Sequence, residues 1–527
     1  MRTYAVLAIL LAAQPFSTAR SQSPAGPPDV LTLNRPAGPE WFGLYLRGKK
    51  AGWSCMEVRR ERRQGMDVLV ARSETALRAT LNMPGSEGTS VERQQLDEKV
   101  YQARPDGRLL SFRSERRGDG GARTVVGSCT EKGCTAKLTA DGSPDKILNL
   151  PPSPETAEQA DAPRLAAALH STVRGTQLEL EQLRDKKMQD VYQGRGKVAG
   201  GGTEVAVSTV AESEEGDRVP ALVSVADDGR LVEIRFGEAL VAKPEPESTA
   251  KRLDRVDLFA LSRVEVPAPL PRDVPGAIQF QVRGLPSGFR KSDDRQSYRE
   301  SGHEVLLTVE ASTPAAADPK KDAPRGQVAE ADRKELLDPT PEIDSDQEDI
   351  VKLARQVTDG TPGVYAASVK LTQAVYERLE KVYGVSHDRA SEVLRAGKGD
   401  CTEHALLFLA LAHAAGIPAR GVHGLVYAQY GDGVPALYWH AWVEVKSGRE
   451  WIALDPTFGQ PVADPTHIAL GRGTQVDTIG LIGGLTIVAA GPKPPSTWRM
   501  WLILAVAAAA LGWAIWRFAP RRKPVHP

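Results

Sequence analysis

The sequence predicts an α+β fold, in which a β-rich N-terminal region precedes a unit of helices and antiparallel strands. Residues 40–310 contain many short strand-like runs separated by turn signals. Residues 343–490 begin with helix-period apolar patterns and end with strand patterns. The third observation is an unbroken apolar stretch over Met500–Trp516, long enough to predict one C-terminal transmembrane helix.

The β-rich region 40–310 is expected to form an antiparallel sheet or an open barrel, as one unit or two. Signals such as Pro105-Asp106-Gly107 and Asp227-Asp228-Gly229 mark turns between its strands. A short helix near Asp161–Arg174 interrupts the strands, with Asp161 as its cap. The region carries no catalytic pattern, so we expect it to serve as a scaffold or a recognition module.

The segment between the two regions, residues 311–342, is rich in Pro, Ala, Asp and Lys and is predicted to be a linker. A Ser-x-x-Glu capping box at Ser345–Glu348 marks the start of the helical part. The predicted helices cover Ile350–Val357, Ala366–Val382, Arg389–Ala396 and Cys401–Ala415.

Both ends of the chain carry targeting patterns. Arg2, an apolar run over Tyr4–Ala13 and small residues at 17–19 predict a secretory signal peptide at 1–19, with a retained N-terminal anchor as the alternative. The transmembrane helix is predicted at 498–518, and the basic residues after it place the tail 519–527 in the cytoplasm. We therefore expect a single-pass protein of the inner or plasma membrane, with a periplasmic or otherwise extracytoplasmic body.

Composition limits the partners and suggests a compartment. Lys plus Arg and Asp plus Glu both total 67, so nothing in the charge predicts a nucleic acid partner. Of four cysteines, Cys129 and Cys134 are close enough to pair as a disulfide outside the cytoplasm; a metal site is the alternative. Cys55 is predicted to be a buried apolar residue.

The fourth cysteine, Cys401, follows Gly399-Asp400 and opens a predicted helix. A helix N-terminus presents unpaired N–H groups and the positive end of the helix dipole, which stabilise a thiolate. The same N–H groups can hold an oxyanion. The position predicts a nucleophile, whereas a structural cysteine would be commoner in the middle of a helix.

A predicted hairpin supplies the partners of this cysteine. If Ser447-Gly448 is its two-residue turn, His440 lies directly opposite Asp455, and opposed residues share one face of a sheet. Asp455 is then able to orient the imidazole toward Cys401, as a nucleophile–base–orienter triad requires. Each residue alone has a structural explanation, since Asp455 ends a strand and His440 fits a half-buried position.

Other polar residues near the motif are predicted to be structural. Glu403 favours the helix dipole, and His404 shares the helix face of Cys401. His413, His423 and His467 have no partner in the sequence pattern. The chain shows no metal-ligand spacing and no phosphate-binding loop, so we expect no metal or cofactor.

These motifs, from about Ser391 to Thr466, resemble the transglutaminase-like superfamily. The matching stretches are Gly-Asp-Cys-Thr-Glu-His-Ala at 399–405, Ala-Gly-Ile-Pro-Ala-Arg at 415–420, His-Ala-Trp-Val-Glu-Val at 440–445 and Leu-Asp-Pro-Thr at 454–457. The resemblance implies a papain-like α+β core over 343–490, with Cys401 as nucleophile, His440 as base and Asp455 as orienter. It also implies acyl transfer from an amide through a thioester.

The sequence leaves several functions open. The leading prediction is a membrane-anchored, extracytoplasmic thiol enzyme that acts on protein or peptide amides, with either an amine or water as acceptor. A cysteine peptidase or amidase is one alternative. A non-catalytic binding module and an envelope scaffold are the others, since a fold alone does not determine function.

Overall fold

The computed structural model describes residues 28–493, apart from 82–88, 119–120, 142, 181–183, 186–188, 199–200, 211–219, 272–275, 383–386, 388, 430–432 and 474–477. The predicted signal peptide (1–19), transmembrane helix (498–518) and tail (519–527) lie outside the described residues.

The predicted fold class is wrong, because the structure is mostly β. Strands make up 47% of it and helices 20%. The imbalance arises because strands of the N-terminal region are long: β2, β3 and β4 have 15, 16 and 14 residues. Within the described part of the chain, no helix is both long enough and apolar enough to cross a membrane.

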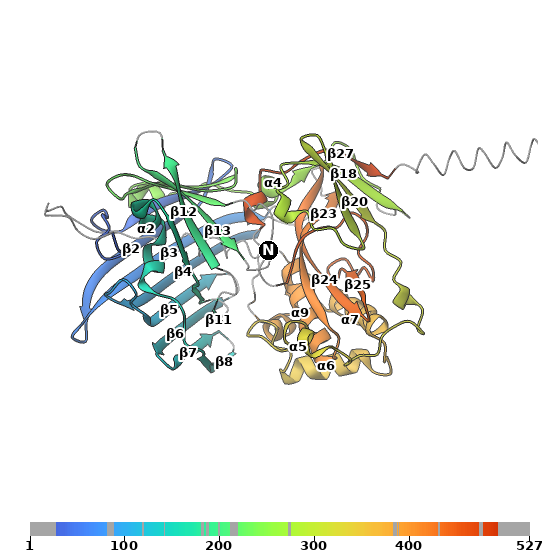
Figure 1. Cartoon of the computed structure of the whole chain (residues 1–527). Coiled ribbons are helices and arrows are strands. Elements are labelled where there is room, and N and C mark those ends of the chain that lie inside the picture. The colour runs from blue at the N-terminus through green and yellow to red at the C-terminus, as the bar shows by residue number, and fades with distance from the viewer. Residues whose placement is uncertain are drawn as a thin grey trace, which may run out of the picture.

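The N-terminal region forms one antiparallel sheet of 14 strands, which curves across one half of the molecule (Figure 1). Its spatial order is β8 (Ser143–Leu150), β7 (Gly133–Ala140), β6 (Gly121–Thr130), β5 (Leu109–Gly118), β4 (Thr89–Gln102), β3 (Met66–Leu81), β2 (Lys49–Arg63), β1 (Glu40–Leu46), β16 (Leu240–Pro244), β15 (Leu231–Phe236), β14 (Ala221–Val225), β13 (Thr203–Val210), β12 (Gln189–Lys197) and β9 (Thr172–Gly175).

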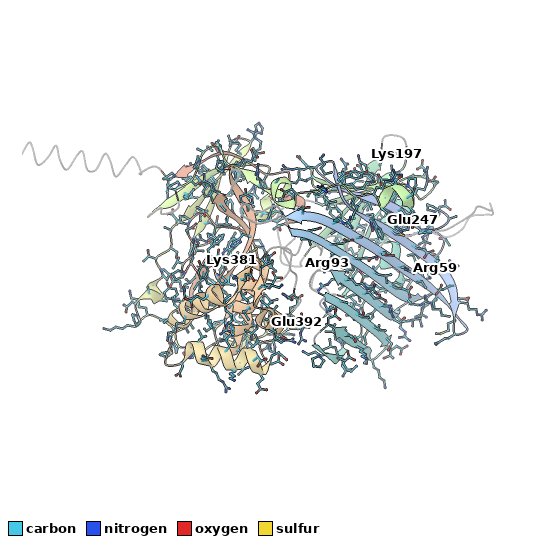
Figure 2. All side chains as sticks on the ribbon, turned by 180° about the vertical axis from the view of Figure 1, so that it is seen from behind. Arg59, Arg93, Lys197, Glu247, Lys381 and Glu392 are labelled. Carbon is cyan, nitrogen blue, oxygen red and sulfur yellow. A yellow bond between two sulfur atoms is a disulfide. The ribbon has the colours of Figure 1, made fainter. Side chains whose placement is uncertain are left out.

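The chain builds this sheet as two arms that meet at β1. It runs outward by hairpins from β1 to β8, crosses over, and returns from β9 to β16, which pairs with β1. The crossover includes a 3-10 helix, Ala157–Asp161, and helix α2, Ala162–Leu169. The buried Arg164 of α2 bonds to Glu40 and Asp161, and this ties the crossover to β1. Figure 2 shows the same sheet from behind, with Arg59 and Arg93 labelled on it.

One hairpin of this sheet contains the predicted disulfide. Cys129 on β6 lies directly opposite Cys134 on β7, and the two are bonded. Along β7 buried residues alternate with exposed ones, so a single face of the strand contributes to the core. The predicted disulfide is therefore confirmed. Cys55, predicted to be buried, is a free thiol that is half-buried.

Residues 276–310 do not join the large sheet and instead contribute three strands to a second one. This four-stranded sheet has the order β19 (Gln296–Ser301), β20 (Glu304–Glu310), β18 (Ala277–Arg283) and β27 (Thr486–Pro492). Its last strand comes from the C-terminal side of the thiol-motif unit, so the chain encloses that unit between β20 and β27. A shared apolar core joins the 14-stranded sheet to this sheet, with Leu44 and Phe280 among its fully buried members.

The unit that carries the thiol motif combines five helices with a third sheet, against which α7 and α9 pack. The helices are α5 (Glu330–Leu336), α6 (Glu348–Thr358), α7 (Val364–Arg378), α8 (Ala390–Ala396) and α9 (Cys401–Ala414). The sheet order is β17 (Val264–Glu265), β24 (Pro435–Ser447), β23 (Ala419–Gln429) and β26 (Ile468–Arg472), with β25 (Glu450–Leu454) pairing with the far half of β24.

Helix α9 lies at the centre of this unit. It contacts β23, β24, α6, α7 and α8, and its side chains from Glu403 to His413 are all buried. A helix that is apolar on every side is expected where neighbours surround it completely. Its N-terminus, which carries Cys401, is therefore held in place by packing on all sides.

Residues 311–342, predicted as a linker, are docked on this unit. Besides α5 they contain Asp322, whose carboxylate accepts hydrogen bonds from the amides of Tyr365 and Ala366 at the start of α7. The Ser447 hydroxyl also donates to Asp322. A composition rich in Pro and Asp therefore serves here to cap a helix and brace a hairpin.

Candidate active site

The motif before Cys401 builds a helix cap. Asp400 is the N-cap of α9: its carboxylate accepts a hydrogen bond from the Thr402 amide at 2.8 Å, and the Glu403 carboxyl accepts one from the Asp400 amide at 2.9 Å. The Glu403 amide also donates to the Asp400 side chain, so Asp400 and Glu403 form a reciprocal capping box. At Gly399 an added Cβ would lie 2.3 Å from the Glu403 side chain, so the close turn requires glycine.

Glu403 has an environment unlike that of an ordinary first-turn glutamate. Burial and the neighbouring Asp400 carboxylate raise the pKa of Glu403 well above its usual value. Glu403 therefore holds a proton more strongly than an ordinary glutamate does, while its carboxyl group caps the Asp400 amide. This agrees with its predicted structural role.

His440 lies in the middle of β24, and Asp455 lies one residue beyond the end of β25. The His440 Nε2 atom and the Asp455 Oδ2 atom are 2.7 Å apart. The Cys401 side chain lies close enough to the His440 ring to favour its protonated form. With Nε2 facing Asp455, Nδ1 is the ring nitrogen available to the thiol. The structure thus brings the three predicted residues together in the order thiol, imidazole, carboxylate.

The hairpin that joins His440 to Asp455 differs from the predicted one. The turn is Gly448-Arg449, and Glu444 pairs with Ala453 where Trp451 was expected. Gly448 has a φ of +63°, a conformation that glycine adopts at little cost at the first position of such a turn. The register is shifted by two residues, and because side chains alternate with a period of two, His440 and Asp455 still share a face.

Asp455 is the most completely satisfied group in the site. Its Oδ1 atom accepts hydrogen bonds from the amides of Thr457 at 2.7 Å and Phe458 at 3.2 Å. Its Oδ2 atom faces His440 and His467. Burial alone would raise the pKa of Asp455, but the charge and hydrogen bonds of the two histidines hold it well below its usual range. The carboxylate is therefore ionised although fully buried.

The same interactions act on His440. Burial opposes protonation of the ring, but the Asp455 charge, the Asp455 hydrogen bond and the contact with Cys401 together raise the pKa of His440 to about 10. A histidine that holds its proton next to a cysteine is the arrangement that stabilises a thiolate–imidazolium pair. Phe458 stacks on the ring, with centroids 4.9 Å apart and planes 12° apart, and fixes its orientation.

His467, which the sequence pattern left without a partner, belongs to this cluster. It is fully buried directly before β26, with Nε2 3.1 Å from Asp455 Oδ2 and Nδ1 3.2 Å from Asp464 Oδ1. Trp442 packs edge-on against its ring at 5.2 Å. The available signal was the Asp464-Pro465-Thr466-His467 turn before a strand, but nothing in the sequence placed that strand near β24.

His440, Asp455 and His467 could be considered as metal ligands, since their ligand atoms lie within 4.8 Å of one another. The distances favour protons instead. Two ligand atoms about 2.0–2.2 Å from a tetrahedral ion lie well over 3 Å apart, whereas the His440 and Asp455 atoms are 2.7 Å apart. The cluster therefore fits a hydrogen-bonded chain better than a metal centre.

Two further residues border the site. His404, one turn after Cys401, is fully buried and its Nδ1 atom is 2.7 Å from the Asp400 carbonyl oxygen. Burial lowers the pKa of His404, so the ring is neutral and that nitrogen donates. Tyr376 of α7 packs against Gly459, next to Phe458, and the Lys381 amine, labelled in Figure 2, lies 4.0 Å above the Tyr376 ring.

Comparison with known proteins agrees with this geometry. Residues 351–456 match the transglutaminase-like superfamily. No curated protein matches the chain.

Three solved structures are similar in part. A proposed cysteine protease from Cytophaga hutchinsonii is 17% identical, with 42% of this chain and 84% of that chain covered and a TM-score of 0.26. A β-barrel-like protein of a domain of unknown function from Brucella abortus is 12% identical, with 39% and 95% covered and a TM-score of 0.28. A proposed protease from Parabacteroides distasonis is 12% identical, with 72% and 65% covered and a TM-score of 0.17.

The predicted resemblance is confirmed for the segment that carries the motif. Residues 351–456 contain α9 with Cys401, the strand with His440 and the end of β25 with Asp455. The family match is thus limited to residues 351–456, the segment that holds all three predicted site residues.

Proposed function

We propose that this protein is a thiol acyltransferase or hydrolase that acts on protein or peptide amides through a thioester on Cys401. The observation that supports this most is that Cys401, at the N-terminus of α9, lies beside His440, whose Nε2 atom is 2.7 Å from the fully buried carboxylate of Asp455. A nucleophile, a base and an orienting group in this order are what acyl transfer from an amide requires.

In the first half-reaction the Cys401 thiolate attacks the carbonyl carbon of the substrate amide. A C–S bond forms and the carbonyl oxygen becomes an oxyanion. The His440 imidazolium then gives its Nδ1 proton to the amide nitrogen, the C–N bond breaks, and an amine or ammonia leaves. Cys401 is left as a thioester and His440 as a neutral base, held in one tautomer because its Nε2–H donates to Asp455.

In the second half-reaction an amine or a water molecule attacks the thioester. His440 accepts the proton of the incoming nucleophile, the C–S bond breaks, and the thiolate and the imidazolium are restored together. An amine acceptor produces a new amide, and water produces a carboxylic acid. The acceptor that reaches the thioester thus decides between transamidation and hydrolysis.

Backbone groups at the start of α9 are the proposed oxyanion donors. The amides of Thr402 and Glu403 are already bonded to Asp400 and that of His404 to the Asp400 carbonyl oxygen. Among the hydrogen bonds between described residues, none engages the Cys401 amide, so it is available to the oxyanion. An amide donor of this kind contributes typically about 3 kcal/mol to the transition state.

The acceptor is tested by incubating the purified protein with a glutamine-containing protein and a labelled primary amine. Amine incorporation with ammonia release is expected for transamidation, and new carboxyl termini or ammonia alone for hydrolysis. Either outcome supports a thiol enzyme if it is blocked by an electrophilic probe that modifies Cys401. A wild-type protein that forms no Cys401 adduct under reducing conditions and turns over no amide would contradict the proposal.

We also propose that the body of the protein works in an extracytoplasmic, oxidising compartment. The Cys129–Cys134 disulfide supports this, because such bonds persist mainly outside the reducing cytoplasm. To test this, cells are denatured in the presence of an alkylating reagent and without any reductant. Cys129 and Cys134 are expected to stay unmodified, and Cys55 is expected to be alkylated. If Cys129 and Cys134 are recovered as alkylated thiols, the protein resides in a reducing compartment.

A further inference from the structure

The chain of hydrogen-bonded groups that begins at Cys401 continues past Asp455 to His467 and Asp464. We propose that His467, held as a cation between these two carboxylates, is a positioning residue of the thiol site that fixes Asp455 and sets how strongly His440 holds its proton. The inference rests on the proposed function, since it assigns a role at the same site.

The charge of His467 follows from what faces its two nitrogens. Nε2 faces the Asp455 carboxylate at 3.1 Å, and Nδ1 faces the Asp464 carbonyl and carboxylate oxygens, both at 3.2 Å. None of these oxygens can donate, because ionised carboxylates and carbonyls only accept. In a neutral ring, one nitrogen would carry a lone pair that faces an oxygen acceptor and could not form a hydrogen bond with it. The ring protonated on both nitrogens is therefore the form that satisfies both contacts.

Asp464 is organised to hold that cation. Its Oδ1 atom accepts a hydrogen bond from the Thr466 amide at 2.8 Å, and its Oδ2 atom accepts one from the Gln460 side chain at 2.8 Å. Partial burial opposes ionisation, but the hydrogen bond and charge of His467 hold the pKa of Asp464 well below its usual range. Asp464 is thus a second ionised carboxylate on the far side of His467.

The four-stranded sheet braces this turn from behind. Arg295, directly before β19, donates to the carbonyl oxygens of Ala463 and Asp464. Gln296 exchanges two hydrogen bonds with the backbone of Ala469, at 2.8 and 3.1 Å. The four-stranded sheet and the residue before it therefore hold in place the turn that carries His467.

The charged groups that face His467 are Asp455 from the end of β25, His440 from β24, Asp464 from its own turn and Arg295 behind Asp464. Its ring centroid lies 5.8 Å from that of His440. The charges alternate along the line from the thiolate to Arg295. The His467 cation repels a proton on His440 and partly neutralises Asp455, so it keeps His440 from holding its proton too strongly to give it up.

The sign of the effect is therefore defined. In His467→Gln the positive charge that repels the His440 proton is removed. The negative charge of Asp455 then acts on His440 without being partly neutralised by His467, so His440 keeps its proton to higher pH. The alkaline limb of activity is expected to move upward, and turnover is expected to fall about 10- to 100-fold, as is typical when a group that orients a catalytic residue is lost. KM is expected to change little, because His467 is fully buried and does not reach the substrate.

The experiment compares wild-type protein with His467→Gln, with the double variant Asp464→Asn/His467→Gln and with His413→Gln. His413 is the matched control: it is also a buried histidine of the same unit, but its Nε2 bonds to the Ala419 carbonyl oxygen. The double variant removes the cation together with its far carboxylate, so it avoids stranding Asp464. Turnover and the rate of Cys401 alkylation by iodoacetamide are measured against pH.

Both His467 variants are expected to show the upward shift in turnover and alkylation profiles, while His413→Gln keeps the wild-type profiles. Nitrogen NMR of the wild-type imidazoles is expected to show His467 doubly protonated at neutral pH. A neutral His467, or variant profiles that coincide with those of His413→Gln, would overturn the inference. If wild-type Cys401 is alkylated no faster than Cys55, the proposed function fails instead, and the NMR result still reports on His467.

Discussion

Replacing Cys401 with alanine is expected to abolish turnover, with a loss of about 10⁴-fold or more, because no other group in the site can form the thioester. The side chain is 6% exposed and the change removes one sulfur atom, so the fold should remain intact. Activity and labelling by an electrophilic thiol probe are measured beside circular dichroism and thermal unfolding of the same samples.

Cys55→Ala is the matched control for this experiment. Cys55 is the other free cysteine, and burial together with Glu74 and Glu57 raises its pKa to about 12, so it is mostly an unreactive thiol. The control should retain full activity and full probe labelling. Turnover that survives Cys401→Ala, or disappears in Cys55→Ala, would place the chemistry elsewhere.

Replacing Asp455 with asparagine is expected to lower turnover by about 10³- to 10⁴-fold, since an amide cannot accept from both histidines and hold His440 in the required tautomer. The pH profile should change as well. The Asp455 charge is a main reason that the pKa of His440 is raised to about 10, so its removal should move the alkaline limb to lower pH. Where turnover is too slow to measure, the rate of Cys401 alkylation against pH is used to follow the change in the pKa of His440.

The same substitution has a signature in stability. Because the pKa of folded His440 lies above its value of about 6.5 in an unfolded chain, the associated stability is full below about pH 6.5 and is lost as the pH rises through about 10. For Asp455 the pKa is depressed, so its stability is present above its unfolded value of about 3.9 and lost in acid. Asp455→Asn should therefore have a lower melting temperature than wild type at neutral pH. If the melting temperature and the alkaline limb of activity are both unchanged, Asp455 does not orient His440.

The sequence by itself determined the local chemistry of the thiol. A cysteine directly after a Gly-Asp cap begins a helix here, because Asp400 and Glu403 satisfy the amides of Asp400, Thr402 and Glu403 without help from the rest of the fold. It also determined that His440 and Asp455 share a face. That result survived a two-residue error in register because strand geometry depends on parity, while the position of the turn depended on the left-handed conformation of one glycine.

The tertiary structure decided what surrounds that chemistry. Local patterns marked strands in residues 40–310, but the union of 14 of them in one sheet depends on a long-range pairing, β1 with β16, that no short segment specifies. In the same way, His467 joins Asp455 because β26 pairs with β23, and the turn before it is held by Arg295, 168 residues earlier in the chain. Contacts between distant segments depend on the packing of whole sheets, so only the folded chain shows that His467 and Asp464 extend the hydrogen-bonded chain of the thiol site.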